Sequence, residues 1–369
     1  MTPADAVARL RLIRTESIGP ITYRQLMARF GSASAALEAL PDLARKGGRK
    51  LSIAGAGAAE DEIAALEAIG GRMIFIGTPD YPVLLAAMES APPVLSLRGD
   101  AGLLERPAVA IVGARNASAA GVRFARMIAA ELAEAELVVV SGLARGIDAA
   151  AHQGALEGGT IAVVAGGVDV AYPPENAVLM AQLAERGLIV AEQRMGVEPQ
   201  ARHFPRRNRI IAGLAAGTLV VEGAPKSGSL ITARLAAGAG REVMAVPGSP
   251  LDPRAQGCNL LIREGATLVQ SAADVVEALS AFSAESGAGS QLGLRYQASE
   301  APGWYDAVAA EAGPEARAAV EGLLSPTPVA VDELVRLSGL AAAAVATVLL
   351  DMELEGGLLR HAGGRVALA

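Results

Sequence analysis

The feature that most constrains the fold of this chain is a regular alternation of short apolar runs and helical patterns between residues 72 and 281. The runs are almost continuously apolar, which is typical of parallel strands covered on both faces of a sheet. From Ala108 onward, helical patterns of about 10–20 residues separate most of them. We therefore expect residues 71–281 to form an α/β domain of the extended Rossmann type, with a doubly wound, mostly parallel sheet. The expected strands are residues 72–76, 94–98, 108–113, 137–140, 160–165, 188–192, 218–222 and 242–246.

The residues before this domain, 1–70, read as an all-α module of short helices joined by glycines. Gly19 and Pro20 form a turn that feeds an amphipathic helix, and Gly31 ends that helix before a second one starts. This pattern of a turn, a helix and a helix-ending glycine is typical of a helix-hairpin-helix, a SAM-like unit that often holds a DNA backbone through loop amides. The alternative is a small helical packing module that binds no ligand.

The residues after the domain divide into a linker and a second small domain. Residues 282–302 are rich in serine, glycine and alanine and indicate the linker. Residues 303–369 suggest a winged helix, made of three helices and a hairpin. The expected helices are residues 314–324, 331–337 and 341–355, and the expected hairpin strands are 358–360 and 365–367. The third helix carries three acids and no lysine or arginine, so it would repel a duplex, and a protein contact is the better expectation.

Charge and cysteine content exclude several function classes. The formal net charge of −7 argues against a protein that is basic over its whole surface, although a local cluster of arginines still governs its own surroundings. The single cysteine, Cys258, forms neither an internal disulfide nor a cysteine-based zinc site. We recognise no signal peptide and no uninterrupted apolar run of about 18 residues. We therefore expect a cytoplasmic protein with no membrane partner, no metal and no cofactor.

Glycine-rich turns follow four of the expected strands. Glycine lets an anion approach backbone N–H groups, and a helix N-terminus adds partial positive charge. Because ligands bind at the carboxyl ends of strands in a doubly wound sheet, these turns predict an anion-binding edge. The residues of interest are Gly113, Arg115 and Asn116 in the first turn, Ser141, Gly142 and Arg145 in the second, Gly166 and Gly167 in the third, and Lys226, Ser227, Gly228 and Ser229 in the fourth.

These turns do not match the phosphate-binding motifs of common nucleotide enzymes. The first is not G-x-G-x-x-G, and Ser141 stands where a dinucleotide enzyme places its ribose-binding acid. The segment that contains Lys226 has no Gly-Lys-Ser/Thr. Both departures argue against NAD and ATP.

A basic segment, ARHFPRRNRIIAGL, lies at residues 201–214. It combines arginines with Phe204 and has no acid between Glu198 and Glu222. Arginine pairs with phosphates while a ring stacks on bases, which together favour single-stranded nucleic acid. The alternative is that some of these arginines pair with acids on neighbouring elements, Arg209 above all. On the binding interpretation, replacing Arg206 and Arg207 with glutamate should abolish DNA binding and leave the melting temperature almost unchanged.

Asp148 and His152 lie at i and i+4, on one face of an expected helix. They could act as an acid–base pair, although no nucleophile or third metal ligand is evident nearby in the sequence. The alternative is that both side chains hydrogen-bond to neighbouring loops and fix the edge of the sheet. We expect no catalytic residue and no metal ligand in this chain.

The ordered motifs resemble the DNA-processing protein A family, also called Smf. They are VAIVGARNASAAG, SGLARGIDAAAHQGAL, TIAVVAGGVDVAYPPEN, FPRRNRIIAGL, KSGSLITARLAAGAGREVMAVPG and GCNLLIREGA. The resemblance implies a homodimer, not an enzyme, that binds single-stranded DNA without sequence preference. It also implies a role in natural transformation, in which the protein protects incoming DNA and helps load the RecA recombinase. The family often reads Ser-Glu before the basic segment, whereas here Ala191 precedes Glu192. The positions that the resemblance assigns to DNA are the four sets of turn residues given above together with Phe204, Arg206, Arg207 and Asn208.

Two alternatives remain open at this point. One is a Rossmann-type nucleotide-binding enzyme, such as a nucleoside-monophosphate phosphoribohydrolase, although that family's Pro-Gly-Gly-x-Gly-Thr loop is absent. The other is an interaction module built around the terminal helical domains, which leaves the arginines between Arg202 and Arg209 unexplained.

Overall fold

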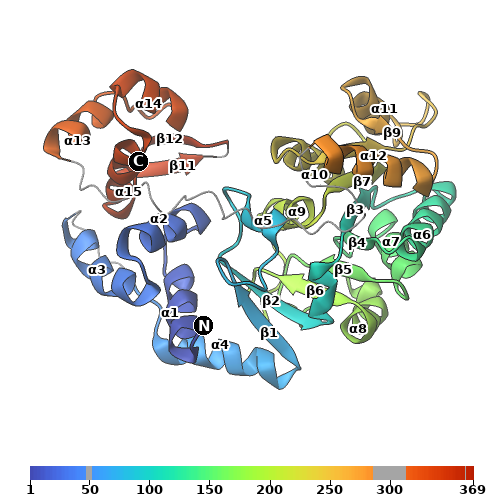
Figure 1. Ribbon diagram of the computed structural model, residues 1–369, viewed down its shortest axis with the longest axis horizontal. Coiled ribbons are helices and arrows are strands. Elements are labelled where there is room, and N and C mark those ends of the chain that lie inside the picture. Colours follow the sequence, from blue (N-terminus) through green and yellow to red (C-terminus); the bar gives the residue numbers. More distant parts are fainter. Residues whose placement is uncertain (47–51, 286–312, 362) are drawn as a thin grey trace. The chain divides into compact units, whose positions relative to one another are not determined.

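A computed structural model describes residues 1–46, 52–285, 313–361 and 363–369 (Figure 1). The chain separates into two compact units. The first combines Met1–Asp61 with Ser299–Ala369 and is called the terminal unit here, and the second, Glu62–Ala298, is called the sheet unit. Each is described by itself.

The sheet unit contains a nine-stranded sheet among its described residues, in the order β1-β2-β6-β5-β4-β3-β7-β8-β9. The pairs β1–β2 and β2–β6 are antiparallel and all the others are parallel. The strands are β1 (Gly71–Phe75), β2 (Val94–Gly99), β3 (Ala108–Gly113), β4 (Val138–Ser141), β5 (Thr160–Val163), β6 (Leu188–Ala191), β7 (Gly217–Val221), β8 (Glu242–Ala245) and β9 (Thr267–Leu268). The helices are α5 (Val83–Ala86), α6 (Ala119–Glu134), α7 (Ile147–Ala155), α8 (Ala177–Arg186), α9 (His203–Leu214), α10 (Gly228–Gly238), α11 (Gln256–Arg263) and α12 (Ala272–Glu285), with short 3₁₀ turns at Ala101–Glu105 and Pro174–Asn176.

Helices cover both faces of this sheet, so its central strands are buried on both sides. Val109 and Ile111 of β3 pack in one apolar cluster with α6, α7 and α12. The residues that alternate with them, Ala110 and Val112, are buried as well, and α9 and α10 contact β3 on that side. The continuous apolar runs in the sequence have their cause in this double burial. The expected α/β fold with a mostly parallel sheet is confirmed.

Each of the eight expected strands corresponds to one of β1–β8, with ends that differ by at most two residues. The ninth strand, β9, was missed because only Thr267 and Leu268 pair in it, which is too short for a periodic pattern. The expected linker is wrong at its start, since α12 continues through Glu285. The rest of that linker, 286–302, lies outside the described residues, and the other two boundaries between segments, after residue 70 and after residue 302, stay predictions.

The terminal unit contains the two flanking modules. Its helices are α1 (Pro3–Arg14), α2 (Pro20–Phe30), α3 (Ala33–Lys46), the start of α4 (Ala56–Ala68), α13 (Pro314–Glu321), α14 (Val331–Ser338) and α15 (Ala342–Leu354). A three-stranded sheet has the order β10-β12-β11, with β10 (Val329–Ala330), β11 (Leu358–His361) and β12 (Arg365–Leu368). As expected, Gly31 ends α2 in a left-handed conformation with φ of 73°. The helical N-terminal module and the C-terminal winged helix are both confirmed.

The acids of α15 contact protein rather than solvent. Asp351 pairs with Arg29 of α2 at 2.6 Å, and Glu353 accepts a hydrogen bond from the Thr22 hydroxyl at 3.1 Å. Arg360 of β11 donates to the same Glu353 at 2.9 Å. Both acids are thus paired within the terminal unit, and the expected contact of this helix with another protein stays a prediction.

No single helix among the described residues has the length and apolar character needed to cross a bilayer, and one sharply bent pair, Val331–Ser338 with Ala342–Leu354, meets those two criteria together.

Candidate nucleic-acid interface

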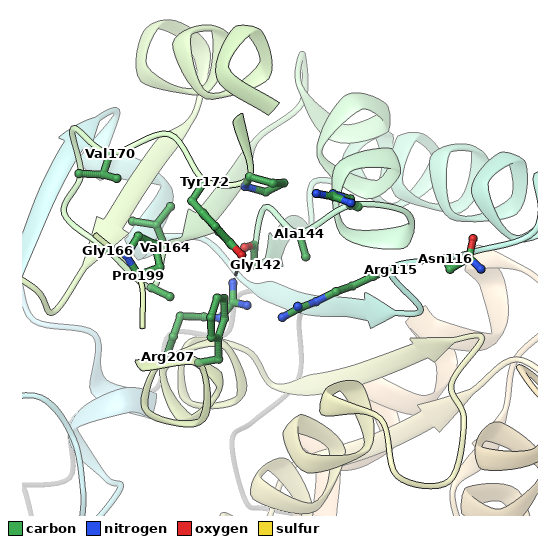
Figure 2. Close-up of a pocket in the computed structure, with 14 residues that line it drawn as sticks. Arg115, Asn116, Gly142, Ala144, Val164, Gly166, Val170, Tyr172, Pro199 and Arg207 are labelled. Atoms are coloured by element: carbon green, nitrogen blue, oxygen red, sulfur yellow. Dashed lines mark hydrogen bonds between the residues drawn. The ribbon is translucent and has the colours of Figure 1, made fainter. Parts of the chain in front are cut away.

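Two adjoining cavities open at the carboxyl ends of the central strands, and Figure 2 shows the residues that line the first. The first, called the Tyr172 cavity, has a volume of about 430 Å³, and the second, called the Ser227 cavity, about 580 Å³. Both volumes fall in the range of about 300–1,000 Å³ that is typical of ligand sites. The two cavities share the residues Arg115, Asn116, Ala144, Phe204 and Arg207.

A cation and a ring form the ridge between the cavities. The guanidinium of Arg115 lies over the Phe204 ring, 5.0 Å from its centroid. Tyr172 adds a second ring on the side of the Tyr172 cavity, with its centroid 5.8 Å from that of Phe204 and the planes tilted by 54°. Arg115 and Tyr172 are both exposed, so the ridge offers a cation and an aromatic ring to solvent. Such a pair can contact a phosphate and a base at once.

Arg207 lies beneath this ridge and is buried. Its guanidinium donates to the carbonyl oxygen of Val163 at 2.8 Å and to that of Gly142, the latter bond drawn in Figure 2. A side chain at Gly142 would occupy the space of this guanidinium, which is why glycine is required there. Burial lowers the pKa of Arg207 to about 10, so it remains a cation at neutral pH. Arg207 therefore joins the ends of β4 and β5 and places a positive charge under both cavities.

The burial of Arg207 contradicts the expectation that glutamate at positions 206 and 207 would leave stability unchanged. Arg206 is exposed, but Arg207 is not a surface residue, and a glutamate in its place would put a buried carboxylate next to Asp148. We therefore expect replacement of both arginines to lower the melting temperature of the sheet unit strongly instead of leaving it almost unchanged. Loss of DNA binding in that double variant would say nothing about a direct contact.

The next residues of α9 also hold neighbouring elements. Asn208 donates to the carbonyl of Gly228 at 3.3 Å and so fixes the start of α10, while its amide oxygen accepts from Nε of Arg207 at 3.1 Å. Arg209 pairs with Glu192 and donates to the carbonyl of Ser90, as the ion-pair alternative anticipated for this arginine. One helix thus positions three strand ends and one helix start around the cavities.

Asp148 and Asn176 fix the loop after β4. The carboxylate of Asp148 accepts from the N–H groups of Gly142 and Ala144 at 3.2 and 3.4 Å. Asn176 donates to the carbonyl oxygens of Leu143 and Ala144 at 2.9 and 3.2 Å. Burial raises the pKa of Asp148, although the charge of Arg207 opposes that shift. The expectation that Asp148 fixes the edge of the sheet is confirmed.

His152 has a structural role as well, and it makes the protein sensitive to acid. The ring is fully buried, Nδ1 lies 2.7 Å from the Thr160 hydroxyl, and burial lowers the pKa of His152 to about 3. The unfolded chain takes up this proton below about pH 6.5 while the folded chain does not, so stability falls as the pH drops through that range. We expect His152 to remove about 2–3 kcal/mol between pH 6.5 and 4.5. Urea unfolding of wild type and His152→Asn should show a smaller pH dependence in the variant, and equal slopes would contradict this role.

The structure brings most of the expected DNA-facing residues together. The residues that line one or both cavities are Gly113, Arg115, Asn116, Gly142, Arg145, Gly166, Phe204, Arg207, Asn208, Ser227, Gly228 and Ser229. Ser141 does not, since its side chain is buried and donates to the carbonyl of Ile111. Gly167 is buried behind the cavities, and Arg206 and Lys226 are exposed outside them.

Sequence reasoning missed several lining residues, of which Tyr172 and Arg254 matter most. Tyr172 lies in a polar loop, where a signal was present, because aromatic residues make up just 3% of the chain and one in such a loop is informative. Arg254 follows β8 in a segment without any motif, so no pattern pointed to it. No cluster of three or more His, Cys, Asp or Glu side chains that could hold a metal ion occurs in the described part of the chain.

Comparison with known proteins shows three matching family models, together spanning most of the chain. Residues 72–280 match the model described as DNA recombination-mediator protein A, residues 3–65 match a DprA-like N-terminal HHH domain, and residues 306–364 match a DprA winged helix domain. The chain is 47% identical over 198 residues to DNA processing protein DprA of Streptococcus pneumoniae, covering 53% of this chain and 70% of the relative. It is 37% identical over 317 residues to protein Smf of Escherichia coli, covering 84% and 80%.

Two solved structures are similar in fold. The X-ray structure of DprA from Streptococcus pneumoniae superimposes with a TM-score of 0.57 at 38% identity, over 67% of this chain and 82% of that one. DNA processing protein A from Helicobacter pylori, whose structure describes a single-stranded DNA binding mode, superimposes with a TM-score of 0.51 at 28% identity, over 56% and 95%.

Proposed function

This chain belongs to the DNA recombination-mediator protein A family, and on that basis we propose that it binds single-stranded DNA, without preference for base sequence, in the Tyr172 and Ser227 cavities. The observation that carries the proposal is the Arg115–Phe204 ridge, which adjoins both cavities and places an exposed cation beside the rings of Phe204 and Tyr172. The Helicobacter pylori relative, described as binding single-stranded DNA, supports the same assignment.

The chemistry of the ridge suits unpaired bases. A ring can stack only on a base that has left its duplex partner, and every base has such a face, so the contact is tolerant of sequence. Phosphates of the same strand lie within reach of the exposed cations around the cavities, for which we propose Arg115, Arg145, Arg206 and Lys226. In this proposal the buried Arg207 adds positive charge beneath the Arg115–Phe204 ridge, and the glycine-rich turns form the walls of the two cavities.

Binding should depend steeply on salt. If these four cations each neutralise one phosphate, the logarithm of the binding constant falls against the logarithm of salt concentration with a slope of about −3. Fluorescence anisotropy with a labelled oligothymidylate, at salt concentrations from about 50 to about 400 mM, measures that slope. A duplex of equal length should bind more weakly at each salt concentration. Equal affinity for duplex and single strand, or a slope near zero, would rule out the proposed mode.

We further propose that the site binds and does not catalyse. The Tyr172 cavity is lined by three arginines and by no carboxylate among the residues that the structure describes. Asp148, which lines the Ser227 cavity, already accepts two backbone hydrogen bonds. Cleavage of a glycosidic bond would need a free carboxylate at this place. Release of adenine from AMP during incubation would favour the phosphoribohydrolase alternative.

Membership of the family also suggests a role in the cell. We propose that the chain acts in the cytoplasm as a homodimer, protects incoming single-stranded DNA during natural transformation and helps load the RecA recombinase onto it. Size-exclusion chromatography with light scattering tests the dimer. The rate of RecA-dependent ATP hydrolysis on DNA coated with a single-strand-binding protein tests the loading, and it should rise when this chain is added.

A further inference from the structure

The N-terminus of α6 is occupied by a carboxylate of the chain itself. Glu222, the residue directly after β7, accepts a hydrogen bond from the backbone N–H of Ser118 at 2.8 Å and a second from the hydroxyl of the same serine. That hydroxyl in turn accepts from the N–H of Gly121 at 2.9 Å and caps the helix. One carboxylate therefore takes up both donors that Ser118 presents at the start of a 16-residue helix.

This is the place where a Rossmann-type domain ordinarily receives a phosphate. The helix that follows a central parallel strand presents N–H groups and partial positive charge at its N-terminus, and ligand phosphates bind there. In this chain α6 follows β3, and β3 pairs with β7 so that Gly113 lies opposite Val221. Glu222 is therefore next to the turn between β3 and α6, and its carboxylate binds the N-cap residue of that helix, Ser118.

Two further features of the backbone accommodate the contact between Glu222 and Ser118. A side-chain carbon added to Gly121 would lie 2.6 Å from the carboxyl carbon of Glu222, so the carboxylate rests directly against the helix only because that residue is glycine. Glu222 itself has φ of +54°, a left-handed conformation that is uncommon outside glycine, asparagine and aspartate. Such a conformation persists where surrounding contacts hold it, and here both carboxylate oxygens are held by Ser118.

A third cavity lies beside the carboxylate. It has a volume of about 420 Å³, and its lining includes Gly121, Arg123, Phe124 and Glu222. It contains a cation, a ring and the first turn of a helix, which are the elements of a nucleotide site, but two carboxylates line it as well. Asp252 pairs with Arg254 at 3.0 Å, and Glu222 lies against the start of α6.

We infer that Glu222 is a specificity-determining residue, an internal substitute for phosphate that excludes nucleoside phosphates and the DNA backbone from the N-terminus of α6. Its carboxylate repels any incoming phosphate and leaves that phosphate no free donor on Ser118. DNA is thereby restricted to the edge formed by α9, and the domain keeps a Rossmann-type sheet without taking up the small nucleotides that such sheets usually bind. The exclusion of small phosphates rests on the geometry around α6 alone, whereas the restriction of DNA to the α9 edge rests on the proposed function.

The test measures binding of AMP and of inorganic phosphate to the full chain by isothermal titration calorimetry, without DNA. Wild type should bind neither at the start of α6, and any weak binding of AMP at the Arg115–Phe204 ridge should be unaffected by changes at Glu222 or Ser118. Glu222→Gly removes the carboxylate and suits the left-handed backbone, and it should bind both ligands at least about tenfold more tightly than wild type. Glu222→Gln keeps an acceptor for Ser118 with almost the same shape, so it provides a second, less disruptive variant, and it should show a smaller gain.

A double variant locates the new site. Adding Ser118→Ala to Glu222→Gly removes the hydroxyl that the phosphate would use, and the gained affinity should fall back toward that of wild type. Wild-type binding of AMP that Ser118→Ala weakens would overturn the inference, because the site would then be open already. Folded Glu222→Gly or Glu222→Gln protein that binds AMP no better than wild type would also overturn it. Since no oligonucleotide is present, failure here is distinct from failure of the proposed DNA binding.

Discussion

Charge reversal at Arg115, in the variant Arg115→Glu, is expected to weaken binding of single-stranded oligonucleotides by about hundredfold or more. The change removes the cation that lies over Phe204, and it puts an acid on the ridge that adjoins both cavities. Loss of a stacked contact accounts for about 1–3 kcal/mol, and repulsion of the nearest phosphate adds to that. Fluorescence anisotropy with the labelled oligothymidylate gives the ratio of dissociation constants.

A matched control separates this local effect from a change in overall charge. Arg186 ends α8 at the opposite edge of the same sheet, just before β6 begins, and it makes an exposed pair with Glu157 at 2.6 Å. Arg186→Glu alters the net charge equally but removes only an exposed ion pair, which contributes little to stability. It should change oligonucleotide affinity by less than about threefold. Equal losses in Arg115→Glu and Arg186→Glu would mean that the ridge is not the binding site.

The largest expected effect on stability comes from Arg207. Arg207→Met should lower the free energy of unfolding by about 3–5 kcal/mol, because it leaves the buried carboxylate of Asp148 without its nearby cation. It also leaves the carbonyl oxygens of Gly142 and Val163 without their donor, and so releases the ends of β4 and β5 from α9. The melting temperature should drop by about 10 °C or more, as measured by circular dichroism.

Its neighbour provides the matched control for stability. Arg206 is exposed one position earlier in α9, and Arg206→Met should change the free energy of unfolding by no more than about 0.5 kcal/mol. Arg207→Lys keeps the charge but not the planar fork that reaches two carbonyl oxygens, so its stability should fall between those of wild type and Arg207→Met. Similar melting temperatures for Arg206→Met and Arg207→Met would show that Arg207 does not hold the strand ends together.

The strands of the sheet unit were predictable because burial on both faces leaves a strong mark in the sequence. Val109, Ala110 and Ile111 are all apolar because each faces a layer of helices. The antiparallel pairing of β2 with β6 left no such mark. Strand order depends on which elements pack together. The residues of one strand do not show whether the neighbouring strand runs parallel or antiparallel to it. The sequence therefore indicated the class of fold but not the position of β1 and β2 at one end of the sheet.

The location of the candidate site could be predicted from the sequence, but the role of each of its residues could not. The glycine turns lie at one edge as expected, yet Gly113 and Gly142 are required because the carbonyl of Val221 and the guanidinium of Arg207 fill the space next to them. The roles of Arg206 and Arg207 differ by helical phase. Arg207 lies three, four and seven positions before Ile210, Ile211 and Leu214, which is the spacing of one buried helix face. That spacing was present in the sequence and could have separated the buried arginine from the exposed one.

The exclusion of small phosphates could not have been foreseen from any motif. Glu222 and Ser118 are separated by 104 positions, and only the pairing of β3 with β7 brings them together. The absence of G-x-G-x-x-G argued against a dinucleotide, but it did not reveal that a carboxylate binds the N-cap residue of α6. Long-range contacts of this kind depend on strand register, which the sequence alone leaves open.

The central claim, that a DNA strand lies across the Arg115–Phe204 ridge, is tested most directly by photocrosslinking. An oligothymidylate that carries single 5-iodouracil bases is irradiated in complex with the full chain, and the crosslinked peptides are identified by mass spectrometry. Because this base reacts with aromatic side chains that stack on it, crosslinks should map to Phe204 and Tyr172 and should disappear in Phe204→Leu/Tyr172→Leu protein. Crosslinks confined to the terminal unit, with none between residues 113 and 254, would contradict the account.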